Sequence, residues 1–144
     1  MITQLADDFR FLGPPMDLCT LTVRVTDLAD RFGFALIHWD DDGLGRAASF
    51  FVKLESGRAV LLTEHAHLIE RQRAKGPLVE VDARDVADIG VTPLVDEVLN
   101  GFQLSREDVD WIAPVDEAYV RDWVRQWADY LARRDRSADG DSSK

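Results

Sequence analysis

Cysteine and long apolar runs are what this chain lacks most clearly. Cys19 is the single cysteine among 144 residues, so no disulfide can form within the chain, and a reducing compartment is expected. No apolar run approaches the ~18 residues that a transmembrane helix needs. The N-terminus shows no basic segment followed by an apolar one, so no signal peptide is predicted. The sequence therefore predicts a cytoplasmic protein that has no contact with a membrane.

Lysine and asparagine are also scarce. Arginine supplies 14 of the 17 basic residues, aspartate supplies 20 of the 27 acidic ones, and Asn100 is the one asparagine. Codons rich in G and C favour this bias. It indicates a bacterial source and says nothing about chemistry.

Positive charge is missing from one third of the chain. The net charge is −10, yet residues 78–122 alone carry 12 acids against Arg84, Arg106 and Arg121, a net of −9. A field of this sign repels phosphate backbones, so direct nucleic-acid binding is disfavoured. The same field attracts a basic protein partner, and a solvated surface that promotes solubility is the simpler alternative.

The remaining composition is that of a folded protein. With 46% hydrophobic and 31% charged residues, the chain can bury a core without a metal or a disulfide. Its length predicts one domain, which we place at residues 1–134. Residues 135–144 are small and polar, which predicts a flexible tail.

A three-stranded antiparallel meander over residues 34–64 is the clearest structural signal. Apolar and β-branched runs alternate there with Asp42-Gly43 and Ser56-Gly57, the residue types of two-residue hairpin turns. Further strands are expected at 18–25 and, as an edge strand, at 78–81. The predicted fold class is α+β, with an antiparallel sheet of about four or five strands.

Helical patterns surround the meander. Apolar spacing predicts short helices at 2–12 and from Thr26 or Asp27 to Phe32, the latter ended by Gly33. Residues 66–75 fit a helix or a loop equally well. Thr92-Pro93 starts a helix that Asn100-Gly101 closes, and Ser105 with Asp108 starts another. A last helix from 114–116 carries one apolar stripe, which we expect to pack on the sheet: Val120, Trp123, Val124, Trp127 and Leu131.

The turn assignments fix which meander residues face each other. Two-residue loops place Trp39 opposite Arg46 and Ser49 opposite Glu64, with His38 diagonal to Ser49. A histidine, a hydroxyl and a carboxylate on one face are the parts of a nucleophilic triad or a ligand-binding face. No nucleophile elbow accompanies them, so His38, Ser49 and Glu64 stand as a candidate ligand face and no catalytic residue is assigned.

Metal and cofactor motifs are absent from the sequence. His65 and His67 lie near Glu64, but a structural zinc site needs four ligands and commonly thiolates. Asp40 begins an acidic run whose twelfth position is Phe51 instead of the glutamate of an EF-hand loop. No metal site and no cofactor are predicted.

A non-catalytic acidic protein-binding module is the function that these patterns favour. In size and charge the chain fits the profile of small acidic bacterial α+β proteins such as antitoxins and immunity proteins, which cover a basic partner. The alternative is a small ligand-binding domain or hydrolase-like enzyme that uses the His38 face, and a homodimer is a further alternative. Acids and neighbouring tryptophans supply the candidate partner-binding residues: Trp39, Asp41, Asp42, Asp96, Glu97, Glu107, Asp108, Asp110 and Trp111.

Overall fold

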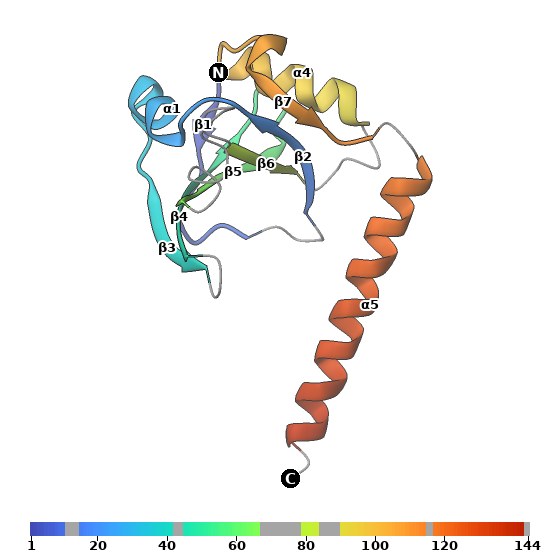
Figure 1. The fold of residues 1–144 in the computed structure, drawn as a ribbon. Helices are drawn as coiled ribbons and strands as arrows, with labels where there is room; N and C mark the ends of the chain where they lie inside the picture. The colour runs from blue at the N-terminus through green and yellow to red at the C-terminus, as the bar shows by residue number, and fades with distance from the viewer. Residues whose placement is uncertain (11–14, 42–44, 67–78, 84–89, 115–116, 143–144) are drawn as a thin grey trace.

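The computed structural model describes residues 1–10, 15–41, 45–66, 79–83, 90–114 and 117–142, and it confirms the α+β class (Figure 1). Within these ranges seven strands form one antiparallel sheet, accompanied by three α-helices and one 3-10 helix. In chain order the elements are β1 (Thr3–Gln4), β2 (Met16–Leu21), α1 (Val25–Phe32), β3 (Ile37–Asp41), β4 (Gly45–Lys53), β5 (Ala59–His65), β6 (Val79–Ala83), α4 (Val91–Gly101), η1 (Arg106–Asp108), β7 (Val109–Ile112) and α5 (Glu117–Ser142).

The sheet has more strands than the sequence predicted. Its order is β1-β4-β5-β6-β2-β7, and β3 pairs with β4. The predicted edge strand at 78–81 is β6, which lies between β5 and β2 inside the sheet, so its placement at an edge was wrong. The two short strands β1 and β7 were not foreseen, because neither has an apolar run of its own.

Both hairpins of the meander are longer by one residue than predicted. Asp41 pairs with Gly45, so three residues separate the paired ends of β3 and β4. In the next turn, Leu54 N–H donates to the carbonyl of Arg58 at 2.7 Å, again across three residues, and Gly57 has φ +93°. A three-residue loop that ends on a left-handed glycine is a standard hairpin connection. The predicted register of all three strands was therefore wrong by one residue.

The segment predicted as a helix over 2–12 begins as a strand. Thr3 pairs with Lys53 of β4, and Leu5 N–H donates to the Phe51 carbonyl at 2.9 Å. Phe9 then packs edge-on against Phe51, with ring centroids 5.2 Å apart. Pairing with β4 thus overrides the helical spacing of the apolar residues, and positions 11–12 lie outside the described residues.

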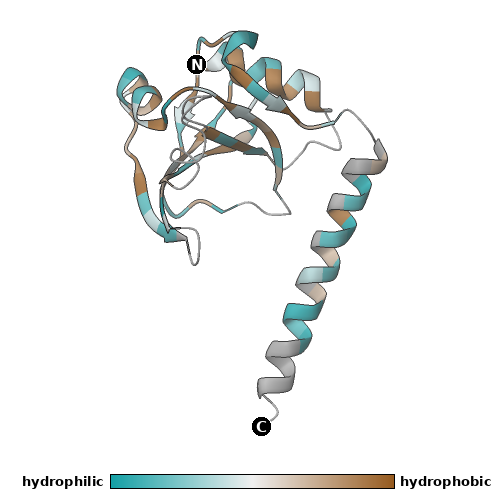
Figure 2. Ribbon diagram, viewed as in Figure 1, coloured by the Kyte–Doolittle hydropathy of each residue, from teal (hydrophilic) through white to brown (hydrophobic). Residues whose placement is uncertain are grey.

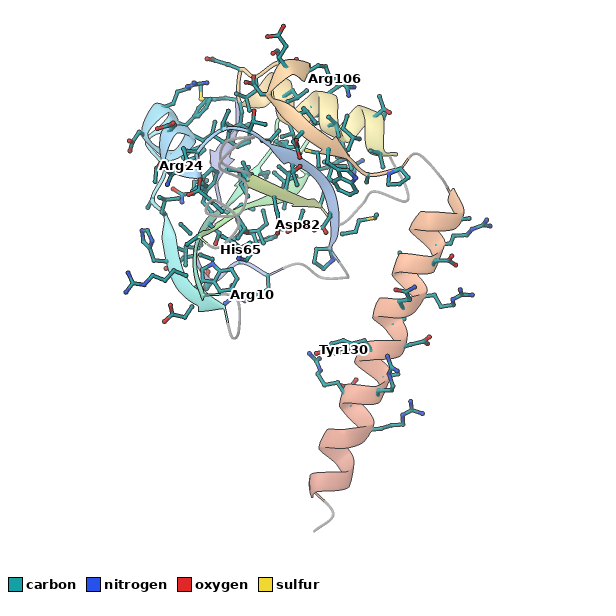
Figure 3. All side chains as sticks on the ribbon, in the orientation of Figure 1. Arg10, Arg24, His65, Asp82, Arg106 and Tyr130 are labelled. Carbon is teal, nitrogen blue, oxygen red and sulfur yellow. The ribbon has the colours of Figure 1, made fainter. Side chains whose placement is uncertain are left out.

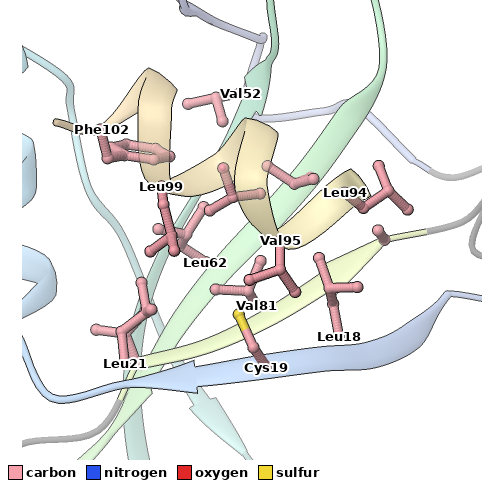
Figure 4. Packing of buried hydrophobic residues seen from close by; sticks show 14 of the residues in the cluster. Leu18, Cys19, Leu21, Val52, Leu62, Val81, Leu94, Val95, Leu99 and Phe102 are labelled. Atoms are coloured by element: carbon pink, nitrogen blue, oxygen red, sulfur yellow. The ribbon is translucent and has the colours of Figure 1, made fainter. Parts of the chain in front are cut away.

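Two helices cover one face of the sheet. α1 ends at Gly33, which takes the left-handed conformation expected at this position (φ +70°). α4 begins after Gly90, two residues before the predicted cap at Thr92, and its buried side chains meet those of β2, β5 and β6 (Figure 4). The apolar core lies between α4 and the sheet. Its central members are Leu18, Leu21, Val52, Leu62, Val81, Leu94, Val95, Leu99 and Phe102.

The C-terminal helix is present, but it stands away from the sheet (Figure 1). Most of the α5 residues coloured by hydropathy in Figure 2 are hydrophilic, and Val124 of the predicted stripe is 41% exposed. Among the described side chains, the expected packing of this helix on the sheet is therefore not observed, and α4 covers the sheet instead; the other members of the stripe have side chains outside the described residues, namely Val120, Trp123, Trp127 and Leu131. The predicted tail from residue 135 is helical as far as Ser142. No helix in the described part of the chain is both long and apolar enough to span a bilayer.

Candidate functional site

The face of the sheet opposite α4 carries a row of residues that runs from strand to strand. Cross-strand pairing places one residue from six of the seven strands in this row, namely Ile37, Ser49, Thr63, Glu80, Thr20 and Trp111. Ser49 and Thr63 are buried, at 5% and 3% exposure, whereas Trp111 at the end of the row is 39% exposed. Polar side chains thus occupy the middle of this face, which we call the polar face, and the other face forms the apolar core.

The predicted grouping of His38, Ser49 and Glu64 does not form. His38 and Glu64 both pair with Ala48 and so share the core side of the sheet, while Ser49 pairs with Thr63 on the polar face. The physical reason is the extra residue in each hairpin, because a slip of one residue moves a side chain to the opposite face. Ser49 therefore cannot reach the carboxylate of Glu64, and no triad geometry results.

Glu64 serves the structure of α1. Its Oε1 accepts hydrogen bonds from Arg24 Nε at 2.9 Å and from the backbone N–H of Val25 at 3.3 Å, and its Oε2 accepts from Arg24 Nη2 at 3.3 Å. A carboxylate at this position satisfies a free N–H at the start of the helix and favours the helix dipole. Because Glu64 is 6% exposed, these bonds also compensate for the burial of its charge.

Ser49 and His65 instead form a small cluster with Trp39 on the polar face. Trp39 Nε1 donates to Ser49 Oγ at 3.1 Å, and its ring meets the His65 ring edge-on at 5.9 Å. His65 Nε2 lies 3.5 Å from Glu80 Oε2. Trp39 remains 38% exposed, so an aromatic surface lies directly above two buried polar groups.

Three carboxyl groups meet further along the polar face. Ligand atoms of Asp17, Glu80 and Asp82 lie within 4.8 Å of one another, and Asp17 pairs directly with Asp82 across β2 and β6. Burial, a hydrogen bond to Asp17 and the charges of Asp17 and Glu80 raise the pKa of Asp82 to about 9. Asp82 is therefore protonated at neutral pH and donates to Asp17.

Among the described residues, these three form the one group of potential metal ligands whose ligand atoms lie close enough to share a cation. A cation would relieve the repulsion between the carboxylates, but the proton on Asp82 already does so. From the sequence, only the proximity of Glu80 and Asp82 could be predicted, because alternate residues of a strand share one face. Asp17 lies more than sixty positions earlier, and nothing local predicts its pairing with β6. Figure 3 labels Asp82 together with His65, on neighbouring strands of this face.

Cys19 contributes no reactive group. Burial, with a smaller contribution from the charge of Asp82, raises the pKa of its thiol to about 12. The thiol is consequently neutral at physiological pH, whereas nucleophilic attack and metal binding require the thiolate.

The predicted acidic residues downstream gather on three successive elements. Asp96 and Glu97 lie on α4, Glu107 and Asp108 on η1, and Asp110 on β7. We call these five residues the acidic edge. Arg106 is the one basic residue in 90–114, and its Nη2 pairs with Asp96 Oδ1 at 2.9 Å, which ties η1 to α4.

Two members of the acidic edge have structural tasks. Asp108 accepts the backbone N–H of Ser105 at 2.9 Å and completes a capping box, as the sequence predicted, although it starts a 3-10 helix of three residues. Glu97 accepts the hydroxyl of Ser56 from the β4–β5 turn. Glu107 and Asp110 are exposed and extend the negative surface towards Trp111.

The predicted partner-binding residues are therefore separated into two regions. Trp111 lies beside the acidic edge on β7, whereas Trp39 lies on β3, at the far end of the strand order (Figure 1). Asp41 is the last residue of β3, and its side chain lies outside the described residues, as does Asp42 altogether.

A groove of about 540 Å³ runs beside α4. Its apolar wall consists of Ile2, Phe32 and Pro93, and its carboxylates are Glu55, Asp96 and Glu97. Sequence reasoning missed this groove, because Glu55 and Ile2 reach α4 only through the folding of the sheet. A smaller hollow of about 340 Å³ lies next to Trp39 and Arg46.

No protein-family model, curated protein or solved structure matches this chain. The candidate sites therefore depend on their own geometry and charge.

Proposed function

We propose that the protein is a non-catalytic binding module that neutralises a basic protein partner through the acidic edge. The proposal rests on one observation above all: five carboxylates lie on α4, η1 and β7, and residues 90–114, which form these elements, contain Arg106 as their one basic residue. A field of one sign over one region steers a partner of the opposite sign and accelerates its association.

Trp111 lies on the polar face and adjoins Asp110, so it extends the candidate contact surface around the edge of the sheet. It is 39% exposed and directly follows Asp110 on a strand at the edge of the sheet. Tryptophan is enriched at the centres of protein interfaces, because its large ring buries much apolar area at little cost in conformational entropy. An exposed aromatic that adjoins the carboxylate of Asp110 along the chain fits a partner surface that combines basic and apolar groups.

The biological setting that we propose is the bacterial cytoplasm, with a role of the immunity or antitoxin type. Size, acidity and the arginine-rich, cysteine-poor composition support this setting. In such a role the acidic edge covers a basic active or nucleic-acid-binding surface of the partner. Nucleic acid itself is disfavoured as a ligand, because its phosphates carry the same charge as the acidic edge.

Quantitative affinity capture from the native host, with a C-terminal tag, tests this proposal. The variant E107K/D110K reverses two exposed charges of the acidic edge, and D7K/D8K reverses two exposed charges on the segment that follows β1. We expect wild type and D7K/D8K to retain the same basic protein and E107K/D110K to lose at least nine tenths of it. Equal retention by all three proteins, or capture of a second copy of the chain alone, would contradict the proposal.

A further inference from the structure

The groove beside α4 has carboxylates of the acidic edge on one side and an apolar wall on the other. Such a groove can bind a side chain that has both a positive charge and an apolar stem. The inference depends on the proposed function, since it names what the basic partner inserts. Asp96 and Glu97 belong to both the acidic edge and the groove, while Glu55 enters from the β4–β5 turn. Among the residues that line the groove, carboxylates are present and lysine and arginine are not.

The apolar wall is held in place by a close contact. Gly101 at the end of α4 lies so near to β1 that a Cβ there would be 2.8 Å from Ile2 Cγ2. Phe32 is fixed from behind by Phe102, whose ring it meets edge-on at 5.5 Å. Ile2 is 7% exposed, so this wall belongs to the core and is not a mobile loop.

The polar side of the groove consists of hydrogen-bond acceptors. The Glu55 side chain is 88% exposed and that of Asp96 is 54% exposed, so both carboxylates are accessible from solvent. Asn100 and Gln103 add amide oxygens along the same groove. The amino group of Met1, which lines the groove, lies 3.9 Å from Glu55 Oε1.

We propose that this groove takes an arginine side chain of the basic partner, together with its neighbouring residues. Arginine combines an apolar stem, which fits against Ile2 and Phe32, with a planar cation whose five N–H groups match several carboxylate and amide oxygens. A volume of about 540 Å³ is within the usual range of binding pockets and exceeds one side chain, which leaves room for adjoining residues.

Within the chain itself, an arginine already forms an ion pair with one of the groove carboxylates. Arg106 binds Asp96 from outside the groove through one carboxylate oxygen, Oδ1. Removal of Arg106 therefore exposes Asp96 fully to a guanidinium in the groove. Arg10 lies at the opposite end of the body from Arg106 and offers a matched control (Figure 3).

Backbone-amide NMR of the full chain provides the test, with Ac-Gly-Gly-Arg-Gly-Gly-NH2 as the probe. We expect the shifts to centre on Asn100, Gly101 and Gln103. The peptide with neutral citrulline in place of arginine should bind at least tenfold more weakly. The variant E55Q/E97Q should weaken binding at least fivefold and E107Q/D110N less than twofold, whereas R106Q should tighten it about twofold and R10Q leave it unchanged.

Equal weakening by E55Q/E97Q and E107Q/D110N, or shifts centred away from the groove, would overturn the inference, as would equal binding of the citrulline peptide. Binding of spermine with the same shifts and a stronger affinity would identify the groove as a site for free cations and would also overturn it.

The captured complex separates this inference from the proposed function. A partner that is lost on E107K/D110K but still binds E55Q/E97Q with wild-type affinity would refute the groove inference and leave the proposed function intact. Absence of any basic partner would refute the proposed function, while the peptide titration would still decide what the groove binds.

Discussion

Asp17 and Asp82 face each other directly across β2 and β6, joined by a hydrogen bond that requires a proton on one of the two carboxyl groups. Two charged carboxylates opposite each other in a sheet would repel. The fold accommodates them by raising the pKa of Asp82 to about 9, so that one member of the pair stays neutral at physiological pH.

This pair makes stability depend on pH. The unfolded chain releases the Asp82 proton near pH 4, and the folded protein keeps it up to about pH 9, so the folded state binds more protons within this window. The free energy of unfolding therefore falls as the pH rises from about 4 to 9, with a slope of at most about 1.4 kcal/mol per pH unit for one such group.

The variant D82N keeps a hydrogen-bond donor towards Asp17 and cannot ionise. We expect its urea midpoint to vary less between pH 5 and 8.5 than that of wild type and to be higher at pH 8.5. D30N, at an exposed position of α1, is the control and should keep the wild-type slope. A slope unchanged in D82N would show that this pair does not govern the pH dependence.

Glu64 is expected to contribute to the stability of the α1 junction. The change E64Q removes a buried carboxylate that binds Arg24 and the N–H of Val25, and it should cost about 2 kcal/mol of unfolding free energy. E55Q, at an 88% exposed side chain, should cost less than about 0.5 kcal/mol. Urea denaturation measures both, and a double-mutant cycle with R24Q isolates the contribution of the ion pair. Equal stability of the two glutamine variants would refute this role.

The contact between Gly101 and Ile2 allows no additional methyl group. G101A places a Cβ 2.8 Å from Ile2 Cγ2, and overpacking of this kind costs roughly 1–3 kcal/mol. The change I2A removes the clashing methyl, so the cost of G101A should be smaller in that background than in wild type. Thermal denaturation of the four proteins measures the difference. An additive result would mean that the clash does not limit this junction.

Local patterns predicted the elements that their own residues specify. The alternation of apolar residues identified β4 and β5, Gly33 marked the end of α1, and Ser105 with Asp108 formed the expected capping box. Each of these signals lies within a few residues of the feature that it specifies, so tertiary contacts were not needed to read them.

Registers and long-range pairs could not be read in the same way. Asp42-Gly43 and Ser56-Gly57 signal a turn, but they do not decide whether the loop has two or three residues. The observed pairing of Asp41 with Gly45 shifts the register by one residue and moves Ser49 away from Glu64.

The strands β1 and β7 exist because β4 and β2 pair with them, and the meeting of Asp17 with Asp82 is equally non-local. The packing of the last helix was misjudged for a related reason. An apolar stripe shows that a helix seeks a partner, but it does not identify that partner.

The central claim is that charge on the acidic edge drives association with a basic protein. The most direct test is the dissociation constant of the captured complex, measured against salt between 50 and 300 mM. We expect wild type to weaken at least tenfold over this range, and E107K/D110K to bind at least tenfold more weakly at low salt with a shallower salt dependence. An affinity that does not change with salt, or that E107K/D110K leaves at the wild-type value, would contradict the claim.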